Sequence, residues 1–228
     1  MIVWDQPGYR VVFTTRVRGV SEGPYASLNL GRLTADDPAN VAENRRRACA
    51  LVEADAGRLA LNRQIHSATV HEAGSGGARA GGDGLWTQLS GVPLLVLTAD
   101  CLPIAIARTA GPRRLAVLHA GWRGLADGIG EAGVEALRGG PLAAAVGPAI
   151  GPCCYEVGGE VSRLFDADLT RAGRLDLWSA AEQKLREAGV EVVERVDLCT
   201  ACNPELFFSH RRDGGVTGRQ GVVGVVVA

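Results

Sequence analysis

The fold is decided by the stretch Val92-Pro93-Leu94-Leu95-Val96-Leu97-Thr98 and by two apolar segments that follow it, Pro103–Arg108 and Arg114–His119. The first stretch is almost continuously apolar, which is typical of a strand that is covered on both faces. A short loop separates it from the second segment, and the turn Thr109–Pro112 separates the second from the third. Strand, short loop, strand, turn and strand predict a mixed β-sheet.

The rest of the chain alternates strand and helix patterns around this centre. Helices are expected where apolar residues recur at helical spacing, and strands where short apolar runs stand between glycine, proline and polar residues. The expected helices span about 37–56, 125–137, 159–165 and 176–188, and the further strands 11–15, 143–146, 190–196 and 220–227. The glycine-rich segment Gly74–Gly84 is expected to be a surface loop. We therefore expect one α/β domain over residues 1–228, with mixed β-sheet layers flanked by helices.

The composition is that of a soluble globular protein and excludes several classes. The chain has 228 residues, of which 46% are hydrophobic and 21% charged, and its net charge is −1. A nucleic-acid binder would be expected to have a basic face, and no run approaches the roughly 18 apolar residues needed to cross a bilayer. The first residues lack the pattern of a secretory signal. We expect a cytoplasmic protein that binds neither membranes nor nucleic acids.

Six cysteines are too few for a disulfide scaffold in a chain of this length, so we expect them to be reduced. Cys199 and Cys202 form a single C-x-x-C pair, which is weak evidence for a metal site when no second pair is present. Cys153 and Cys154 are adjacent, a poor geometry for sharing one tetrahedral ion. These four residues are expected to be structural or weakly reactive thiols.

Three residues at the ends of separate apolar segments form the best candidate metal site: His66, Cys101 and His119. Two imidazoles and a thiolate suit Zn²⁺, and three protein ligands leave a fourth position for water or substrate, as in catalytic zinc sites. Each residue taken singly could equally be an ordinary buried polar group. Asp100 could orient a ligand histidine, as carboxylates commonly do. His71 is a rival ligand, but it is expected to lie on the surface.

Arginine clusters offer candidate sites for phosphate or carboxylate groups. In Asn44-Arg45-Arg46-Arg47, the apolar stripe of the expected helix places Arg45 closest to the buried side, so Arg45 is the one predicted to face a pocket. A second cluster is His210-Arg211-Arg212. The sequence does not decide whether Trp122 and Arg123 pack or stack on a ring.

Taken together, these segments resemble the YfiH-like, laccase-domain proteins, a family long labelled polyphenol oxidases and now regarded as zinc-dependent purine nucleoside phosphorylases. The Ala99-Asp100-Cys101 and His119–Gly124 blocks are the most specific. The matching segments run from end to end: 24–30, 40–45, 64–66, 83–85, 98–103, 119–124, 150–158, 204–209, 211–213 and 217–220. One departure is Ser67, where the family usually has glycine. A side chain there could narrow the pocket and change substrate preference.

The resemblance implies a zinc ion held by His66, Cys101 and His119, and phosphorolysis of adenosine, inosine and methylthioadenosine to a free base and ribose 1-phosphate, with adenosine deamination as a further activity. Arg45 and Asp83 match the family's functional arginine and aspartate. Arg45, helped by Arg212, is expected to position phosphate. Asp83 is expected to bind ribose or handle a proton. Gln64 is a further candidate substrate contact, and the protein is expected to be a monomer or homodimer.

Three alternatives remain open at the level of sequence. In the first, Cys101 is the nucleophile of a cysteine hydrolase or deamidase and His119 is its base. In the second, copper replaces zinc in a polyphenol oxidase, although four histidines in the whole chain are too few for multicopper chemistry. In the third, the protein is a zinc-stabilised interaction module without catalytic activity.

Overall fold

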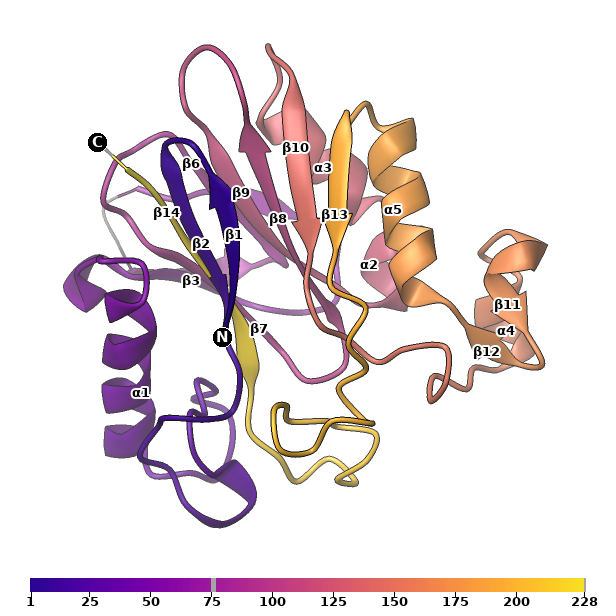
Figure 1. Cartoon of the computed structure of the whole chain (residues 1–228), viewed down its shortest axis with the longest axis horizontal. Coiled ribbons are helices and arrows are strands. Elements are labelled where there is room, and N and C mark those ends of the chain that lie inside the picture. The colour runs from indigo at the N-terminus through magenta and orange to yellow at the C-terminus, as the bar shows by residue number, and fades with distance from the viewer. Residues whose placement is uncertain (75–76, 228) are drawn as a thin grey trace.

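Two mixed six-stranded sheets pack face to face at the centre of the molecule (Figure 1). The computed structural model describes residues 1–74 and 77–227. The first sheet has the strand order β1-β2-β14-β7-β3-β5 and the second the order β13-β10-β8-β9-β6-β4. Helix α1 covers the outer face of the first sheet, and α2, α3 and α5 cover that of the second. A small ribbon, β11–β12, projects with α4 from the side of α5.

The strands and helices have the following bounds. The strands are β1 Ile2–Gln6, β2 Tyr9–Phe13, β3 Ala60–Arg63, β4 Val70–Glu72, β5 Gly77–Gly81, β6 Gly84–Thr87, β7 Leu94–Thr98, β8 Leu102–Arg108, β9 Leu115–Ala120, β10 Leu142–Val146, β11 Thr170–Arg171, β12 Arg174–Leu175, β13 Val192–Arg195 and β14 Gln220–Val226. The helices are α1 Pro38–Ala50, α2 Trp122–Ala126, α3 Ile129–Ala136, α4 Gly159–Ser162 and α5 Leu177–Glu187, with short 3₁₀ turns at Gly23–Tyr25, Ala56–Arg58 and Ala167–Leu169.

Strand β8 shows why the central strands are apolar throughout. Ile104 and Ile106 face the helices of the second sheet, whereas Ala105 and Ala107 face the first sheet. Both faces are therefore buried, and successive side chains point to opposite sides of the strand. The small alanines on the inner face leave room for larger side chains of the first sheet, such as Phe13. The continuous apolar run follows from this double burial.

The predicted α/β class and the strands named from the sequence are confirmed, with ends displaced by a few residues. The strands build two sheets, where the local pattern indicated only a mixed arrangement. The helix expected over 125–137 is broken at Gly128, whose φ of 91° is left-handed, so α2 and α3 are separate. The loop predicted for Gly74–Gly84 is wrong in part, since β5 and the start of β6 occupy most of it. Residues 75–76 of that segment lie outside the described residues.

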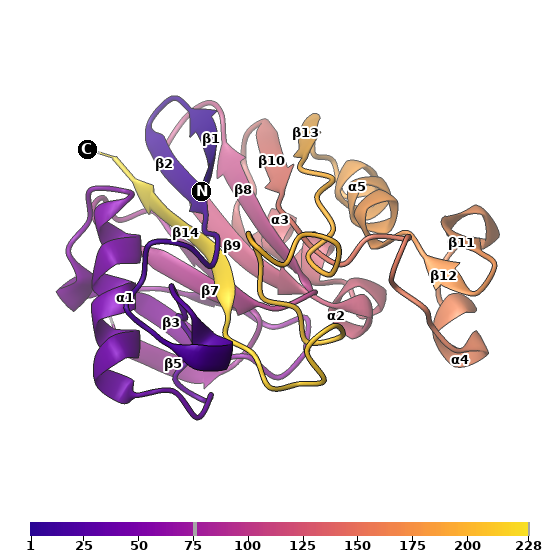
Figure 2. The same ribbon diagram turned by 60° about the horizontal axis from the view of Figure 1, so that its bottom comes forward.

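The chain crosses from the first sheet to the second at residues 99–101, between β7 and β8. Strands β3 and β7 are parallel neighbours, so both end at this edge. In the second sheet, Leu102 at the start of β8 pairs with Ala120 at the end of β9. The loops after β10 and β13 gather at the same end of the molecule, which Figure 2 brings forward. In the described part of the chain, no helix combines the length and the apolar character needed to cross a membrane.

Candidate metal centre

The edge where the two sheets meet brings together His66, Cys101 and His119. One nitrogen from each imidazole and the Cys101 sulfur all lie within 4.8 Å of one another. The two imidazole rings meet edge to face, with centroids 4.9 Å apart and planes at 75°. His119 is buried at the end of β9, Cys101 is half-buried in the crossover, and His66 is exposed after β3. The exposed histidine places one side of this triad in contact with solvent.

Asp83 connects the two histidines. Its Oδ1 accepts hydrogen bonds from Nδ1 of His119 at 2.8 Å and from the backbone N–H of His66 at 3.0 Å. Its Oδ2 accepts from the backbone N–H of Ile65 at 3.1 Å and from the N–H and hydroxyl of Ser67 at 2.7 and 2.9 Å. The Asp83 side chain has no exposed surface. It therefore positions the two histidines, and the role expected from the sequence, binding ribose or handling a proton, stays a prediction.

Asp100 does not play the part suggested for it. Its Oδ1 accepts from the Thr200 hydroxyl at 2.6 Å and its Oδ2 from the Arg211 N–H at 2.7 Å. Its φ of 92° lies in the left-handed region, as does that of His66 at 61°. Such conformations cost free energy unless surrounding contacts hold them. Asp100 thus holds the loop that follows β13 beside Cys101. The carboxylate that hydrogen-bonds to a histidine of the triad is that of Asp83.

The three ionisable groups perturb one another strongly. Burial opposes ionisation of the Cys101 thiol, but the charges and hydrogen bonds of His119 and His66 lower its pKa to about 6. Burial likewise disfavours the charged His119, yet Cys101 and Asp83 raise its pKa to about 9. Burial would raise the pKa of Asp83, but hydrogen bonds from His119, Ser67 and Ile65 hold it well below its usual range. The site thus favours the thiolate, the form that binds metals and acts as a nucleophile.

Two small residues allow this packing. A Cβ atom on Gly121 would lie 3.0 Å from Sγ of Cys101 and 3.5 Å from Cδ2 of His66, so any side chain there would press into the triad. Ser67 turns its hydroxyl toward Asp83, and that hydroxyl also accepts from the Thr69 N–H at 3.2 Å. The expectation that Ser67 narrows the pocket is therefore not supported by its orientation.

The other predicted substrate residues are committed to backbone groups. Gln64 bridges Leu97 on β7, accepting from its N–H at 2.8 Å and donating to its carbonyl at 2.7 Å. Arg45 donates to the Leu30 carbonyl at 2.9 Å, and burial lowers its pKa to about 10. Arg212 donates to the carbonyls of Thr200 and Phe207 at 2.9 and 3.0 Å and pairs with Asp213. Arg212 thus organises a loop, and the predicted contact with phosphate is not available to it in this arrangement.

Two residues near the triad, Tyr155 and Arg219, were not singled out from the sequence, and Arg211 was named only as part of the second arginine cluster. Burial, followed by the negative charge of Cys101, raises the pKa of Tyr155 to about 12. The Arg211 guanidinium lies over the Tyr155 ring, 5.6 Å from its centroid. Arg219 is half-buried, and the negative charges of Cys101 and Asp100 act on it. All three stand in segments that match the family pattern, which was the available signal.

The remaining sequence candidates are placed elsewhere. Nε2 of His71 pairs with the Gly81 carbonyl at 3.0 Å, so His71 is not part of the triad. Arg123 stacks on its neighbour Trp122, with its guanidinium 4.4 Å from the ring centroid. The four cysteines expected to act as separate thiols converge instead, since their sulfurs lie within 4.8 Å of one another. The adjacency of Cys153 and Cys154 does not prevent this.

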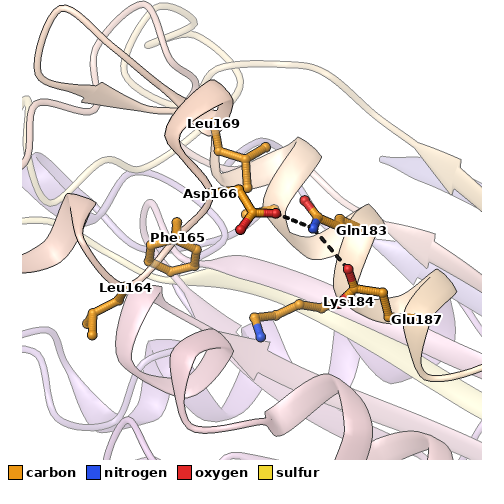
Figure 3. A pocket seen from close by; sticks show the side chains of 8 residues that line it. Leu164, Phe165, Asp166, Leu169, Gln183, Lys184 and Glu187 are labelled. Carbon is orange, nitrogen blue, oxygen red and sulfur yellow. Dashed lines mark hydrogen bonds between the residues drawn. The ribbon is translucent and has the colours of Figure 1, made fainter.

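A hollow of about 140 Å³ lies between α5 and the segment that follows α4 (Figure 3). Asp166 accepts a hydrogen bond from Gln183 across it at 2.6 Å, and Gln183 also donates to Glu187 at 2.9 Å. Leu164 and Phe165 supply its apolar side. Its lining residues include no member of the triad and no cysteine.

The sequence model of a family described as multi-copper polyphenol oxidoreductase laccase matches residues 10–227. The chain belongs to this family. Among laccase-domain relatives, the purine nucleoside phosphorylase YfiH of Escherichia coli is 39% identical over 230 residues, covering 95% of this chain and 93% of that protein. A purine nucleoside phosphorylase of Pseudomonas aeruginosa is 41% identical over 232 residues, with the same two coverages.

Solved structures of similar proteins show the same fold. The crystal structure of YlmD from Geobacillus stearothermophilus superposes with a TM-score of 0.90 at 34% identity, covering 97% of this chain and 93% of that one. A Neisseria meningitidis protein superposes with a TM-score of 0.89 at 33% identity, covering 100% and 99% of the two chains. The laccase-domain fold therefore extends over the whole chain.

Proposed function

We propose that this chain is a zinc-dependent purine nucleoside phosphorylase acting on adenosine, inosine and methylthioadenosine. In this reaction the glycosidic bond between C1′ and the purine nitrogen breaks, and a phosphate oxygen forms the new bond to C1′. The products are the free base and ribose 1-phosphate. The names of the relatives support this activity. The observation that carries the proposal is the convergence of His66, Cys101 and His119 at a partly exposed edge.

The donor set fits a zinc ion. Because Asp83 binds Nδ1 of His119, Nε2 is left for a metal. The Cys101 thiol has a lowered pKa, which favours the thiolate that zinc requires. When bound with an open position, zinc supplies Lewis-acid polarisation of a substrate group or lowers the pKa of a bound water. Sulfur and imidazole ligands also suit copper, so metal analysis of the purified protein must identify the ion.

The chain's own residues would bind and orient the substrates around this edge. The charges of Cys101 and Asp100 act on Arg219, whose Nη1 donates to the carbonyls of Thr217 and Gly218 at 3.0 and 2.8 Å. Arg211 lies over Tyr155, and its Nη2 donates to the Glu156 carbonyl at 3.1 Å. Each guanidinium group has further N–H groups with which it would bind phosphate. The half-buried Tyr155 ring offers an apolar surface for the purine. We assign phosphate binding to Arg219 and Arg211. Arg45, which donates to the Leu30 carbonyl through Nε, is a further candidate, whereas Arg212 organises a loop.

The decisive experiment incubates zinc-loaded protein with adenosine, with and without phosphate, and separates the products. Adenine and ribose 1-phosphate that form only with phosphate support phosphorolysis. Inosine formed under both conditions indicates deamination, which we include as a second activity of the same site. The absence of phosphate-dependent base release from adenosine, inosine and methylthioadenosine alike would refute the proposal.

A second candidate function rests on one specific observation. Asp83 binds His119, and His119 interacts with the Cys101 thiol, so the three resemble a cysteine nucleophile with its base and orienting carboxylate. A cysteine hydrolase would be inactivated by alkylation and indifferent to chelators. His66 argues against this alternative, because it too contacts the thiol and has no role in such a triad.

A further inference from the structure

We propose that Cys153, Cys154, Cys199 and Cys202 form a second, structural zinc site that fixes two irregular loops at the edge of the triad. The four sulfurs lie within 4.8 Å of one another. Sγ of Cys202 is 3.3 Å from that of Cys154 and 3.5 Å from that of Cys153. Four thiolates are the ligand set of closed, structural zinc sites.

The spacing of the sulfurs suits one shared ion. With Zn–S bonds of about 2.3 Å, the sulfurs of a tetrahedral site lie about 3.8 Å apart. The distances of 3.3 and 3.5 Å and the limit of 4.8 Å bracket this value. Cys202 is nearly equidistant from Cys153 and Cys154, so the arrangement does not select one pair for a disulfide. A cation at the centre would use all four sulfurs equally.

The backbone around Cys199 is arranged for a thiolate. The Gly151 N–H donates to Sγ of Cys199 at 3.3 Å. Hydrogen bonds to a ligand atom are the usual support of a metal site.

At this position an ion would join two irregular loops. Cys153 and Cys154 lie in the loop after β10, and Cys199 and Cys202 in the loop after β13. The backbones of these loops meet at Ala149 and Cys199, where the Thr200 N–H donates to the Ala149 carbonyl at 3.0 Å. A metal clip is a common way to stabilise segments with little regular structure.

The same segments form part of the surroundings of the triad. The Thr200 hydroxyl donates to Asp100, which precedes Cys101 in the chain. The Ile150 N–H donates to the Asp100 carbonyl at 2.9 Å. Both loops therefore donate hydrogen bonds to the residue before Cys101. An ion that ties Cys153 and Cys154 to Cys199 and Cys202 would hold this arrangement without entering the reaction.

The test measures zinc per chain after purification in zinc-supplemented, reducing buffer. We expect two zinc ions in the wild-type protein and one in Cys202→Ser, whose exposed side chain contacts both Cys153 and Cys154. The variant His66→Gly/Cys101→Ser removes the triad and should retain one ion. Cys49→Ala, which removes a buried cysteine outside both clusters, is the matched control and should retain two. A wild-type protein with one zinc ion that Cys202→Ser retains overturns the proposal.

A second measurement leaves all four cysteines in place. The His66→Gly/Cys101→Ser variant, loaded with Co²⁺, should show the intense sulfur-to-metal charge-transfer absorption of a tetrahedral thiolate site. Absence of that band in the folded, reduced protein would contradict the proposal. So would an intact mass lower by two hydrogens in protein prepared without oxidant, because it assigns a disulfide. Neither readout depends on phosphorylase activity, so the second site and the proposed function can fail separately.

Discussion

The triad and the four-cysteine cluster are built on different kinds of backbone. His66, Cys101 and His119 stand at the ends of strands in two packed sheets, where the register of β8 and β9 fixes their positions. The four cysteines stand on the loops after β10 and β13, which share few backbone contacts of their own. We expect the scaffold to order the triad without an ion, whereas an ion at the cluster would order the loops that carry it.

The triad and the cluster also differ in the number of their ligands and in the groups that hydrogen-bond to those ligands. The triad has three protein ligands, an exposed histidine and a buried carboxylate that holds both imidazole-bearing segments. The cluster has four sulfurs and the backbone N–H of Gly151 as a hydrogen-bond donor. Three ligands leave a position for substrate, and four close the coordination sphere. The difference assigns reactivity to one site and stability to the other.

Stepwise chelation should separate the two sites and has the largest expected effect. The triad ion should leave first, because it has three ligands and an exposed side, and phosphorylase activity should disappear with little change in melting temperature. Removal of the second ion should then lower the melting temperature by about 5 °C or more, since each kcal/mol corresponds to about 2–4 °C in a domain of this size. Parallel measurements of zinc content, activity and melting would check this. Simultaneous loss of both properties would remove the distinction between the sites.

The variant His66→Gly should reduce kcat/KM by about 10³-fold, because loss of a ligand removes several kcal/mol of metal-dependent stabilisation. Glycine is suited to the φ of 61° at this position, so the fold should be preserved. Steady-state kinetics with adenosine and phosphate would measure the effect, and circular dichroism would verify folding.

The same variant discriminates between the two candidate chemistries of Cys101. A cysteine hydrolase needs Cys101, His119 and Asp83 and would keep most of its activity without His66. Retained activity in His66→Gly, combined with inactivation of the wild-type protein by alkylation, would therefore favour a nucleophilic thiol and leave the four cysteines as the metal site.

The sequence predicted what local patterns determine. The apolar run of β7 and the polar residues at strand ends were sufficient to name the central strands and the three residues that converge. The role of Asp83 was not accessible from local patterns, because one partner is the His119 side chain, which is distant in the chain, and the others include the N–H groups of Ile65, His66 and Ser67, which carry no sequence signal. Asp100 was the more obvious candidate only because it is adjacent to Cys101 in the chain.

The four-cysteine cluster was missed for a related reason. A lone C-x-x-C and an adjacent pair, about 50 residues apart, do not form a recognised spacing. Their convergence depends on how the loop after β10 lies beside the loop after β13, a long-range property of the fold. For Arg45 the sequence predicted the position but not the partner. The helical stripe placed it correctly near the buried side but could not reveal its bond to the Leu30 carbonyl.

The variant Asp83→Asn should weaken the triad and leave the cluster unchanged. An amide cannot accept all the hydrogen bonds that the carboxylate accepts, so buried donors lose their partner. We expect activity or triad metal affinity to fall by about 10–100-fold, as is typical when a residue that orients a metal ligand is lost. The free energy of unfolding should fall by about 3 kcal/mol. Metal titration and denaturant unfolding would measure these two effects.

Asp100→Asn is the matched control for Asp83→Asn. Asp100 contacts Thr200 and the Arg211 backbone but neither histidine of the triad, so triad metal affinity should change less. Equal losses of triad metal affinity in the two variants would show that the loops connected to the cluster support the triad as strongly as Asp83 does. The triad would then depend on the metal-bound loops as well as on the two sheets, and the two sites could not be described as independent.

The smallest expected effect is that of Ser67→Gly, which installs the residue usual in the family. Asp83 would lose one hydroxyl donor and keep the N–H groups and His119, so the free energy of unfolding should fall by about 1 kcal/mol. Since the hydroxyl faces Asp83, kcat/KM should change by less than about fivefold, the factor equivalent to 1 kcal/mol. The ratio of kcat/KM for adenosine and inosine should stay the same. A large change in that ratio would mean that Ser67 faces the substrate, and that the histidine segment is less firmly held by Asp83 than its hydrogen bonds indicate.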